Sequence, residues 1–301
     1  MQNGNKKITV LSVSFKSAKH LSRLFKNLAG KAGDKKSIQF LVVDKTNGND
    51  KQLSTIKSDE YDVSIIGCQN NHKQRSKSHA EALDKGLELV DTKYTLILDP
   101  DVHVFKQEWD NYLINKIEDN TIIGAPYPPW KIGKVHDYPS VVFMFFRTQE
   151  IKKLKKSFSP FPVLLKILSN SLFRKFNRLL FLANKHRLNS YKILRSITKY
   201  LENLFGITSP DTGNKIICAM RDSNFKSINF NACYSNDLNQ NVFSSHHDLA
   251  KYFELYLNKN EIFLTHMYGS GVFHWKTKKG DNVEYWLSLI KKIEKEKKWI
   301  I

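Results

Sequence analysis

The sequence predicts an α/β protein with a mostly parallel central sheet flanked by helices. Over residues 1–105, short apolar runs alternate with segments whose apolar residues recur at helical spacing. Such alternation is typical of parallel sheets, whose ligands bind at the carboxyl ends of the strands. Two of the apolar runs end at aspartates, Asp44 and Asp99. With 41% hydrophobic residues among 301, the chain can bury a full core.

The elements follow from these patterns in chain order. Strands are expected over residues 8–15, 38–44, 63–67 and 94–98, and helices over residues 18–28 and 76–90. Beyond them we expect a helix over 109–118, an extended segment over 121–125, a rigid proline-rich loop over 126–130 and a strand over 141–147. A short helix over 215–220 and a terminal amphipathic helix from Val283 complete the chain.

These elements divide into three parts. Residues 1–150 are expected to form an α/β half that contains the Asp99-Pro100-Asp101 motif, and residues 151–208 a basic amphipathic helical insertion. Residues 209–301 are expected to return to the same domain and to end in the terminal helix.

Two carboxylates separated by one residue follow the fourth strand, in Asp99-Pro100-Asp101. Side chains at i and i+2 share one face of a strand, so both carboxylates can reach one hard cation such as Mg²⁺ or Mn²⁺. Pro100 stiffens the turn between them. Two acids in an ordinary surface turn are the alternative interpretation.

The net charge of +19 is concentrated in one stretch. Residues 151–201 contain 13 Lys or Arg and no Asp or Glu, and the basic residues fall between Leu, Ile and Phe at roughly helical spacing. This pattern favours a helix lying in the interface of an anionic membrane.

Other features bear on the compartment. Three cysteines without metal-site spacing, Cys68, Cys218 and Cys233, indicate reduced thiols in the cytosol. The polar residues 1–7 lead directly into the first strand, so no apolar leader is expected, and no apolar run reaches about 18 residues. We therefore expect a cytoplasmic protein, peripheral on the cytoplasmic face of a membrane.

Four segments together resemble a known family. They are Ser12-Val-Ser-Phe15, Val42-Val-Asp44, Thr95-Leu-Ile-Leu-Asp-Pro-Asp101 and the later His266-Met-Tyr-Gly-Ser-Gly271. Their order is similar to that of GT-A-fold nucleotide-sugar glycosyltransferases, closest to the family 2 enzymes. The resemblance covers residues 6–105, about a third of the chain, and is thin afterwards.

The resemblance implies that residues 1–150 bind the nucleotide sugar and that residues 209–301 form the acceptor side of the same catalytic domain. Asp44 would contact the nucleotide base, and Asp99 and Asp101 would hold Mn²⁺ or Mg²⁺ on the donor diphosphate. The remaining donor-binding residues would be Ser12, Ser14, Arg75 and His79, with Lys73 and Lys77 beside them. A solvated basic loop is the alternative for the cluster at 73–79.

The family also implies a third metal ligand and a catalytic base. A histidine near the end of the domain often completes the metal site; His266 fits through its Gly-rich surroundings, and His274 is the alternative. Asp211, ahead of a helix, is the expected base that deprotonates the acceptor in an inverting transfer. An ordinary helix cap is its alternative interpretation. Asp137 and Asp237 are weaker candidates for the base.

Three aromatic residues of the proline-rich region, Tyr127, Trp130 and Tyr138, could form a platform over a sugar or a lipid head group. A packed loop is the favoured alternative.

The sequence thus predicts a metal-dependent glycosyltransferase that uses a nucleotide-sugar donor and a glycan or lipid-linked acceptor at a membrane surface. A nucleotidyltransferase is disfavoured because residues 12–18 lack the glycine of a phosphate loop. Nucleic-acid binding is disfavoured because the positive charge lies among aliphatic residues rather than stacking aromatics. A non-catalytic membrane adaptor would leave Asp44, Asp99 and Asp101 without a role.

Overall fold

The computed structural model describes residues 6–56, 61–69, 74–160, 188, 190–238, 244–267 and 282–300, the last four without their side chains. Residues 161–187 and 189 of the predicted basic insertion, as well as Lys73, His274 and the glycines of the 266–271 segment, lie outside these residues.

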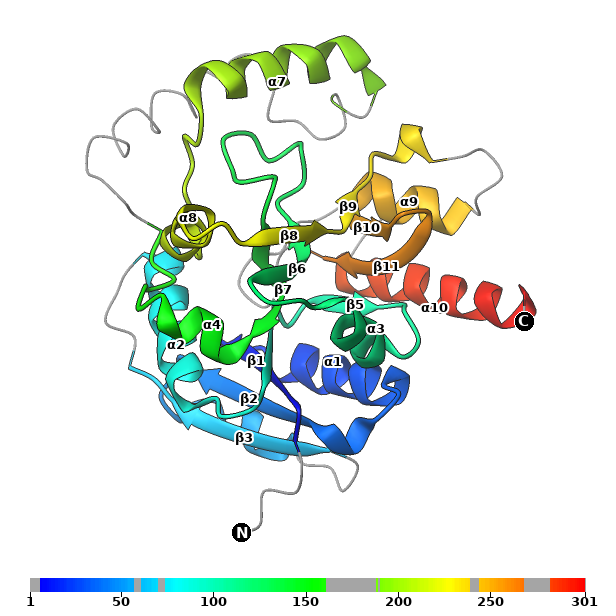
Figure 1. Ribbon diagram of the computed structural model, residues 1–301. Helices are drawn as coiled ribbons and strands as arrows, with labels where there is room; N and C mark the ends of the chain where they lie inside the picture. Colours follow the sequence, from blue (N-terminus) through cyan, green and yellow to red (C-terminus); the bar gives the residue numbers. More distant parts are fainter. Residues whose placement is uncertain are drawn as a thin grey trace.

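The centre of the fold is a seven-stranded sheet with the order β3-β2-β1-β4-β7-β6-β8 (Figure 1). Its six strand pairings differ in direction. β1 with β2 and β4, β2 with β3, and β6 with β8 are parallel, whereas β7 runs antiparallel to both β4 and β6. The strands are β1 Ile8–Ser14, β2 Ile38–Asp44, β3 Asp62–Gly67, β4 Tyr94–Leu98, β6 Thr121–Pro126, β7 Pro139–Arg147 and β8 Lys226–Asn229. The predicted fold class is therefore confirmed: an α/β fold with a mostly parallel central sheet flanked by helices.

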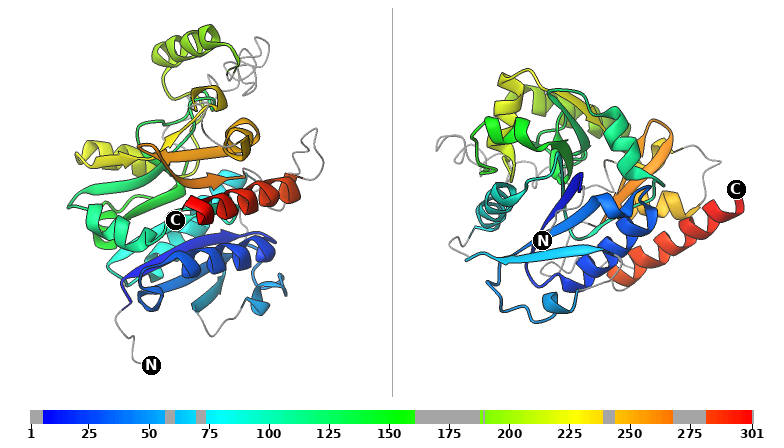
Figure 2. Two further views of the ribbon diagram at one scale, coloured as in Figure 1. Left: turned by 90° about the vertical axis from the view of Figure 1, so that its right-hand side faces the viewer. Right: turned by 60° about the horizontal axis from the view of Figure 1, so that its bottom comes forward.

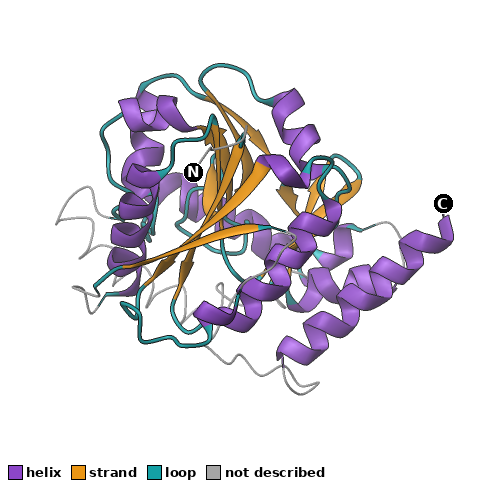
Figure 3. Cartoon of the chain, turned by 90° about the horizontal axis from the view of Figure 1, so that it is seen from below, coloured by secondary structure: helices purple, strands orange, loops and turns teal. Residues whose placement is uncertain are grey.

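Helices cover both faces of this sheet because its strands are apolar on both sides (Figure 3). One core contains α1 (Ala18–Lys31) and α3 (Trp109–Lys116), packed on residues such as Val10 and Phe40. The opposite core contains α2 (Arg75–Leu89), α4 (Thr148–Lys153) and α8 (Asn214–Asp222). Successive residues of one strand enter opposite cores, as Val10 and Leu11 of β1 do.

A second, antiparallel sheet was not predicted. It has the order β5-β11-β10-β9 and consists of β5 Val102–Val104, β9 Asn231–Ala232, β10 Glu254–Asn258 and β11 Glu261–His266. Helices α9 (Ser244–Tyr252) and α10 (Asn282–Ile300) pack beside it around the buried Trp286. Its strands β5 and β9 are too short for a periodicity to reveal.

Helix α7 (Lys192–Phe205) stands away from both sheets (Figure 1 and Figure 2). Short 3₁₀ turns occur at Lys35–Ser37, Leu53–Thr55 and Ser235–Asp237. Within the described ranges, no helix combines the length and apolar character needed to cross a bilayer.

Candidate active site

The two sheets meet at a cluster of two carboxylates and one imidazole. Asp99 and Asp101 follow β4, and His266 is the last residue of β11, so it lies on a strand rather than in the expected loop. One ligand atom from each of the three lies within 4.8 Å of the others. His266 Nε2 is 3.3 Å from Asp101 Oδ1 and 3.9 Å from Asp99 Oδ2.

Backbone hydrogen bonds fix the turn that carries the two aspartates. The amide of Asp99 donates to Val142 O on β7 at 3.1 Å, and the amide of Met267 donates to Asp101 O at 3.0 Å. The guanidinium of Arg23 on α1 donates to Pro100 O at 3.3 Å and to Val102 O at 2.5 Å. The carboxylates therefore project from a turn held by both sheets and by α1.

A buried carboxylate orients His266. Glu254, the first residue of β10, lies with Oε2 2.7 Å from His266 Nδ1, so that Nε2 faces the two aspartates. Tyr256 donates its hydroxyl to the same oxygen at 3.0 Å, and Lys131 Nζ is 2.6 Å from Oε1. A histidine whose second nitrogen is held by a carboxylate is the usual arrangement behind a metal ligand.

The cluster perturbs the protonation of its members strongly. Burial raises the pKa of Asp99 to about 7, with His266 opposing the shift and Asp101 adding to it. Burial disfavours charged His266, but Asp101 and Glu254 together raise its pKa to about 10. Burial would raise the pKa of Glu254, but Lys131 and His266 lower it well below its usual range. Carboxylates this close together repel one another. Without a metal ion, they are stabilised by cationic side chains nearby, which is a common arrangement in a metal site.

His79 lies at the margin of the cluster. It sits on the first turns of α2 with Nε2 3.9 Å from Asp99 Oδ1. Burial lowers the pKa of His79 to about 4 despite the opposing field of Asp211. At neutral pH the ring is uncharged and can serve as a hydrogen-bond donor or acceptor.

Asp211 precedes α8 and faces the same region. Its Oδ2 is 2.6 Å from Lys134 Nζ, and its Oδ1 accepts the amide of Thr212 at 2.9 Å. Burial would raise the pKa of Asp211, but Lys134, the amide of Thr212 and Lys131 together lower it, so the carboxylate is ionised at neutral pH. The charge of Asp211 contributes to raising the pKa of Asp99, which shows that the two carboxylates share one electrostatic environment.

The other expected donor residues have partners within the fold. Ser12 is fully buried and donates to Leu98 O at 2.8 Å, and the buried Ser14 hydroxyl lies 3.3 Å from the Ser17 amide. The carboxylate of Asp44 accepts amides of the following turn, at residues 46 and 48. Arg75 is the exposed first residue of α2. Their contact with a donor stays a prediction.

The weaker candidates for the base lie in surface ion pairs: Asp137 with Arg221, and Asp237 with Arg195. Among the aromatic residues, Trp130 is buried against Tyr234 with ring centroids 5.0 Å apart. The packed-loop interpretation therefore describes Trp130.

Three residues of the site escaped sequence reasoning: Glu254, Lys131 and Lys134. Each lysine pairs with a carboxylate of the site, Lys131 with Glu254 and Lys134 with Asp211. Both come from the loop between β6 and β7, which was interpreted only for its prolines and aromatics. The local signal was two lysines three residues apart within that loop.

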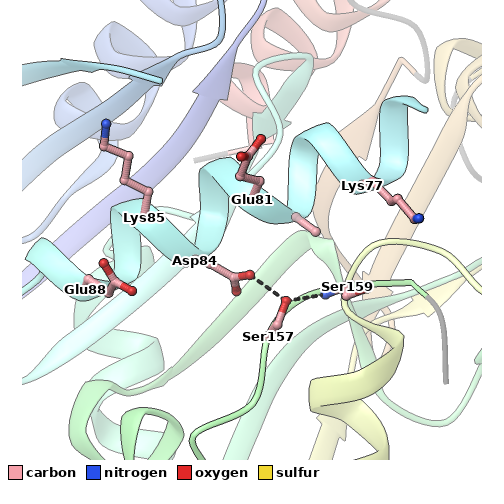
Figure 4. Close-up of a pocket in the computed structure, with 8 residues that line it drawn as sticks. Lys77, Glu81, Asp84, Lys85, Glu88, Ser157 and Ser159 are labelled. Carbon is pink, nitrogen blue, oxygen red and sulfur yellow. Dashed lines mark hydrogen bonds between the residues drawn. The ribbon is translucent and has the colours of Figure 1, made fainter. Parts of the chain in front are cut away.

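A separate cleft of about 490 Å³ lies along the outer side of α2 (Figure 4). Ser157 donates to Asp84 Oδ2 at 2.5 Å, and the amide of Phe158 donates to Oδ1 at 2.8 Å. None of the three cluster residues lines this cleft. Its polar contacts attach the segment after α4 to α2.

No protein-family model and no curated protein matches the sequence. Among solved structures, the chain is similar to the mannosyltransferase PcManGT from Pyrobaculum calidifontis in complex with GDP-Man and Mn²⁺, with a TM-score of 0.40 and 12% identity over 50% of this chain and 47% of that one. It is also similar to S. aureus TarS 1-349 in complex with UDP-GlcNAc, with a TM-score of 0.38 and 16% identity over 50% and 48%. The chain thus spans about half of each of these two proteins.

Proposed function

We propose that the protein is a metal-dependent glycosyltransferase that moves a sugar from a nucleotide-sugar donor to a glycan or lipid-linked acceptor. The observation that carries the proposal is the Asp99, Asp101 and His266 cluster, which lies at the carboxyl end of β4 and shares its electrostatic environment with Asp211. Ligands of α/β sheets bind at this edge.

The donor atoms of the cluster fit a divalent cation. Carboxylate oxygens suit both Mg²⁺ and Mn²⁺, and an imidazole nitrogen adds a softer ligand. This set favours Mn²⁺, held by Asp99, Asp101 and His266. Once bound, the cation would offset the negative charge that develops on a departing nucleoside diphosphate.

The protein's own residues divide the remaining work. Asp211, ionised at neutral pH, takes the proton of the acceptor hydroxyl as the anomeric carbon is attacked. Because Lys134 Nζ is only 2.6 Å from Asp211, the acceptor hydroxyl must compete with this lysine for the carboxylate. A single displacement of this kind inverts the anomeric configuration.

The donor is held on the other side of the cluster. Asp44 contacts the nucleotide base at the end of β2, and Ser12 and Ser14 line the end of the neighbouring β1. Arg75 and His79, at the start of α2, lie beside the diphosphate. The acceptor side faces a membrane, as the concentration of Lys and Arg in residues 151–201 supports, on the cytoplasmic face.

The test is a thermal-shift measurement with nucleoside diphosphates, with and without Mn²⁺. A ligand that binds only the folded state raises the melting temperature. We expect a shift that needs Mn²⁺, that persists in the exposed control Asp62→Ala, and that disappears when Asp99→Ala is combined with Asp101→Ala. Equal shifts in the double variant and in the control would remove the metal site from the proposal. A folded protein that responds to no nucleotide would favour a non-catalytic membrane adaptor.

A further inference from the structure

Helix α7 meets the rest of the protein mainly through polar contacts, beside Leu194, which packs against Trp130 and Tyr234. Arg195 forms an ion pair with Asp237 at 2.6 Å, and its guanidinium lies 3.8 Å from the ring centroid of Tyr234. Thr198 is buried, and Glu202 accepts hydrogen bonds at the 131–136 loop. These three residues, at i, i+3 and i+7, share one side of the helix.

The opposite side of α7 is apolar and exposed. Ile193, Ile197, Tyr200 and Leu204 follow one another at i, i+4, i+7 and i+11 and therefore form a single stripe, here called the outer stripe. Their exposed fractions are 77%, 43%, 67% and 64%. A surface helix ordinarily turns its apolar stripe to the core and its charges to water. In α7 the outer stripe instead faces away from the core, and Leu194 is the apolar residue of the helix that packs against the Trp130 cluster.

The charges beside the outer stripe indicate what covers it. Lys192 and Lys199, seven residues apart, are both exposed along one flank of the stripe. In the sequence, all 13 charged residues of 151–201 are basic. A partner protein of mixed charge would gain little from such a surface, whereas an anionic bilayer offers both negative charge and an apolar interior. We infer that the outer stripe of α7 docks on an anionic lipid surface.

The loop at residues 131–136 connects α7 to the candidate site. The carboxylate of Glu202 accepts the amide of Gly133 at 2.6 Å and lies 3.0 Å from His136 Nε2. The same loop carries Lys131 and Lys134, which pair with carboxylates of the site. The lipid surface is thus joined, through one loop, to the pair formed by Lys134 and the proposed base. In this respect the inference rests on the proposed function, and it narrows the acceptor to one carried by a lipid.

Vesicle flotation of the full chain tests this docking. Two lipid compositions are compared, phosphatidylcholine alone and phosphatidylcholine with phosphatidylglycerol. We expect binding to the anionic vesicles only, weakening as salt is added. Replacing the four residues of the outer stripe with serine should reduce binding at least about tenfold, because the apolar surface that would leave water on docking is lost. The control Leu89→Ser, on α2 and 56% exposed, should bind as the unmodified protein does.

Three outcomes would overturn the docking. One is equal binding by the four-serine variant and the unmodified protein. Another is a failure of the unmodified protein to bind anionic vesicles. If light scattering then finds a dimer that the four-serine variant dissociates, the outer stripe contacts a second copy of the chain instead of a membrane. The last is equal binding to both vesicle types.

The nucleotide thermal shift, measured on the same samples, keeps the two proposals separate and checks that the variant is folded. A four-serine variant that retains its Mn²⁺-dependent shift while losing vesicle binding supports the docking. Vesicle binding without any nucleotide shift would refute the proposed function and leave the docking intact.

Discussion

Glu254→Gln tests how the candidate metal site is built. The substitution preserves the shape of the side chain but removes the charge that holds His266 Nδ1 at 2.7 Å and Lys131 Nζ at 2.6 Å. The substitution should change two quantities that can be measured separately. One is the cation affinity and the other is the free energy of unfolding.

The magnitudes follow from the burial of this network. Loss of a carboxylate behind a metal-binding histidine typically costs about 10- to 100-fold in metal affinity, or about 1.4 to 2.8 kcal/mol. The side chains of Glu254 and Lys131 are only 3% and 13% exposed. Removing one partner of a buried ion pair costs about 3 to 5 kcal/mol of stability. A second substitution, Lys131→Met, removes the charge left behind and should recover much of that loss.

The assay is calorimetric titration with Mn²⁺, paired with urea unfolding. We expect Glu254→Gln to lower both affinity and stability, and the double variant with Lys131→Met to regain stability while its Mn²⁺ affinity stays low. The control is Glu261→Gln, which breaks the exposed pair with Lys106. It should change stability by less than about 1 kcal/mol and leave the affinity unchanged.

Two results would refute this reasoning. Unchanged Mn²⁺ affinity in a folded Glu254→Gln variant would mean that Glu254 does not orient a metal ligand. Recovery of both stability and affinity on adding Lys131→Met would mean that the affinity loss reflected the unpaired lysine rather than the orientation of His266.

The remaining predictions concern the base, its lysine and a buried histidine. Asp211→Asn should retain Mn²⁺-dependent nucleotide binding while transfer falls at least about 100-fold; full turnover would exclude Asp211 as the base. Lys134→Met removes the cation that lowers the pKa of Asp211, so the acidic limb of the kcat/KM profile should move to higher pH, and an unmoved limb would contradict the pairing. Burial lowers the pKa of His103 to about 4, so the folded state favours the neutral ring. The neutral His103 ring therefore contributes to stability above pH about 6.5. This contribution is lost as pH falls toward 4, because the unfolded chain takes up the proton first. Between pH 7.5 and 5.5 the loss is about 1.3 kcal/mol, and it should vanish from urea unfolding curves in His103→Gln.

Much of the central sheet could be predicted because its signals are local. The runs ending at Ser14, Asp44 and Leu98 are mostly apolar, and they form β1, β2 and β4 as expected. The second sheet could not be predicted because its strands β5 and β9 span three and two residues. Such strands are stabilised by their neighbours rather than by a pattern of their own. The glycines after His266 suggested a loop, but pairing with β5 and β10 extends the strand to His266 itself.

The sequence by itself determined that Asp99 and Asp101 share one turn, because a spacing of two residues is a local property. It also predicted an amphipathic helical insertion over residues 151–208, the range in which α7 lies. Only the tertiary structure brought His266 to the aspartates and Glu254 to His266, since contacts between distant segments depend on strand order and packing. It alone decided that the apolar side of α7 faces outward, because periodicity fixes the faces of a helix but not which of them meets the core.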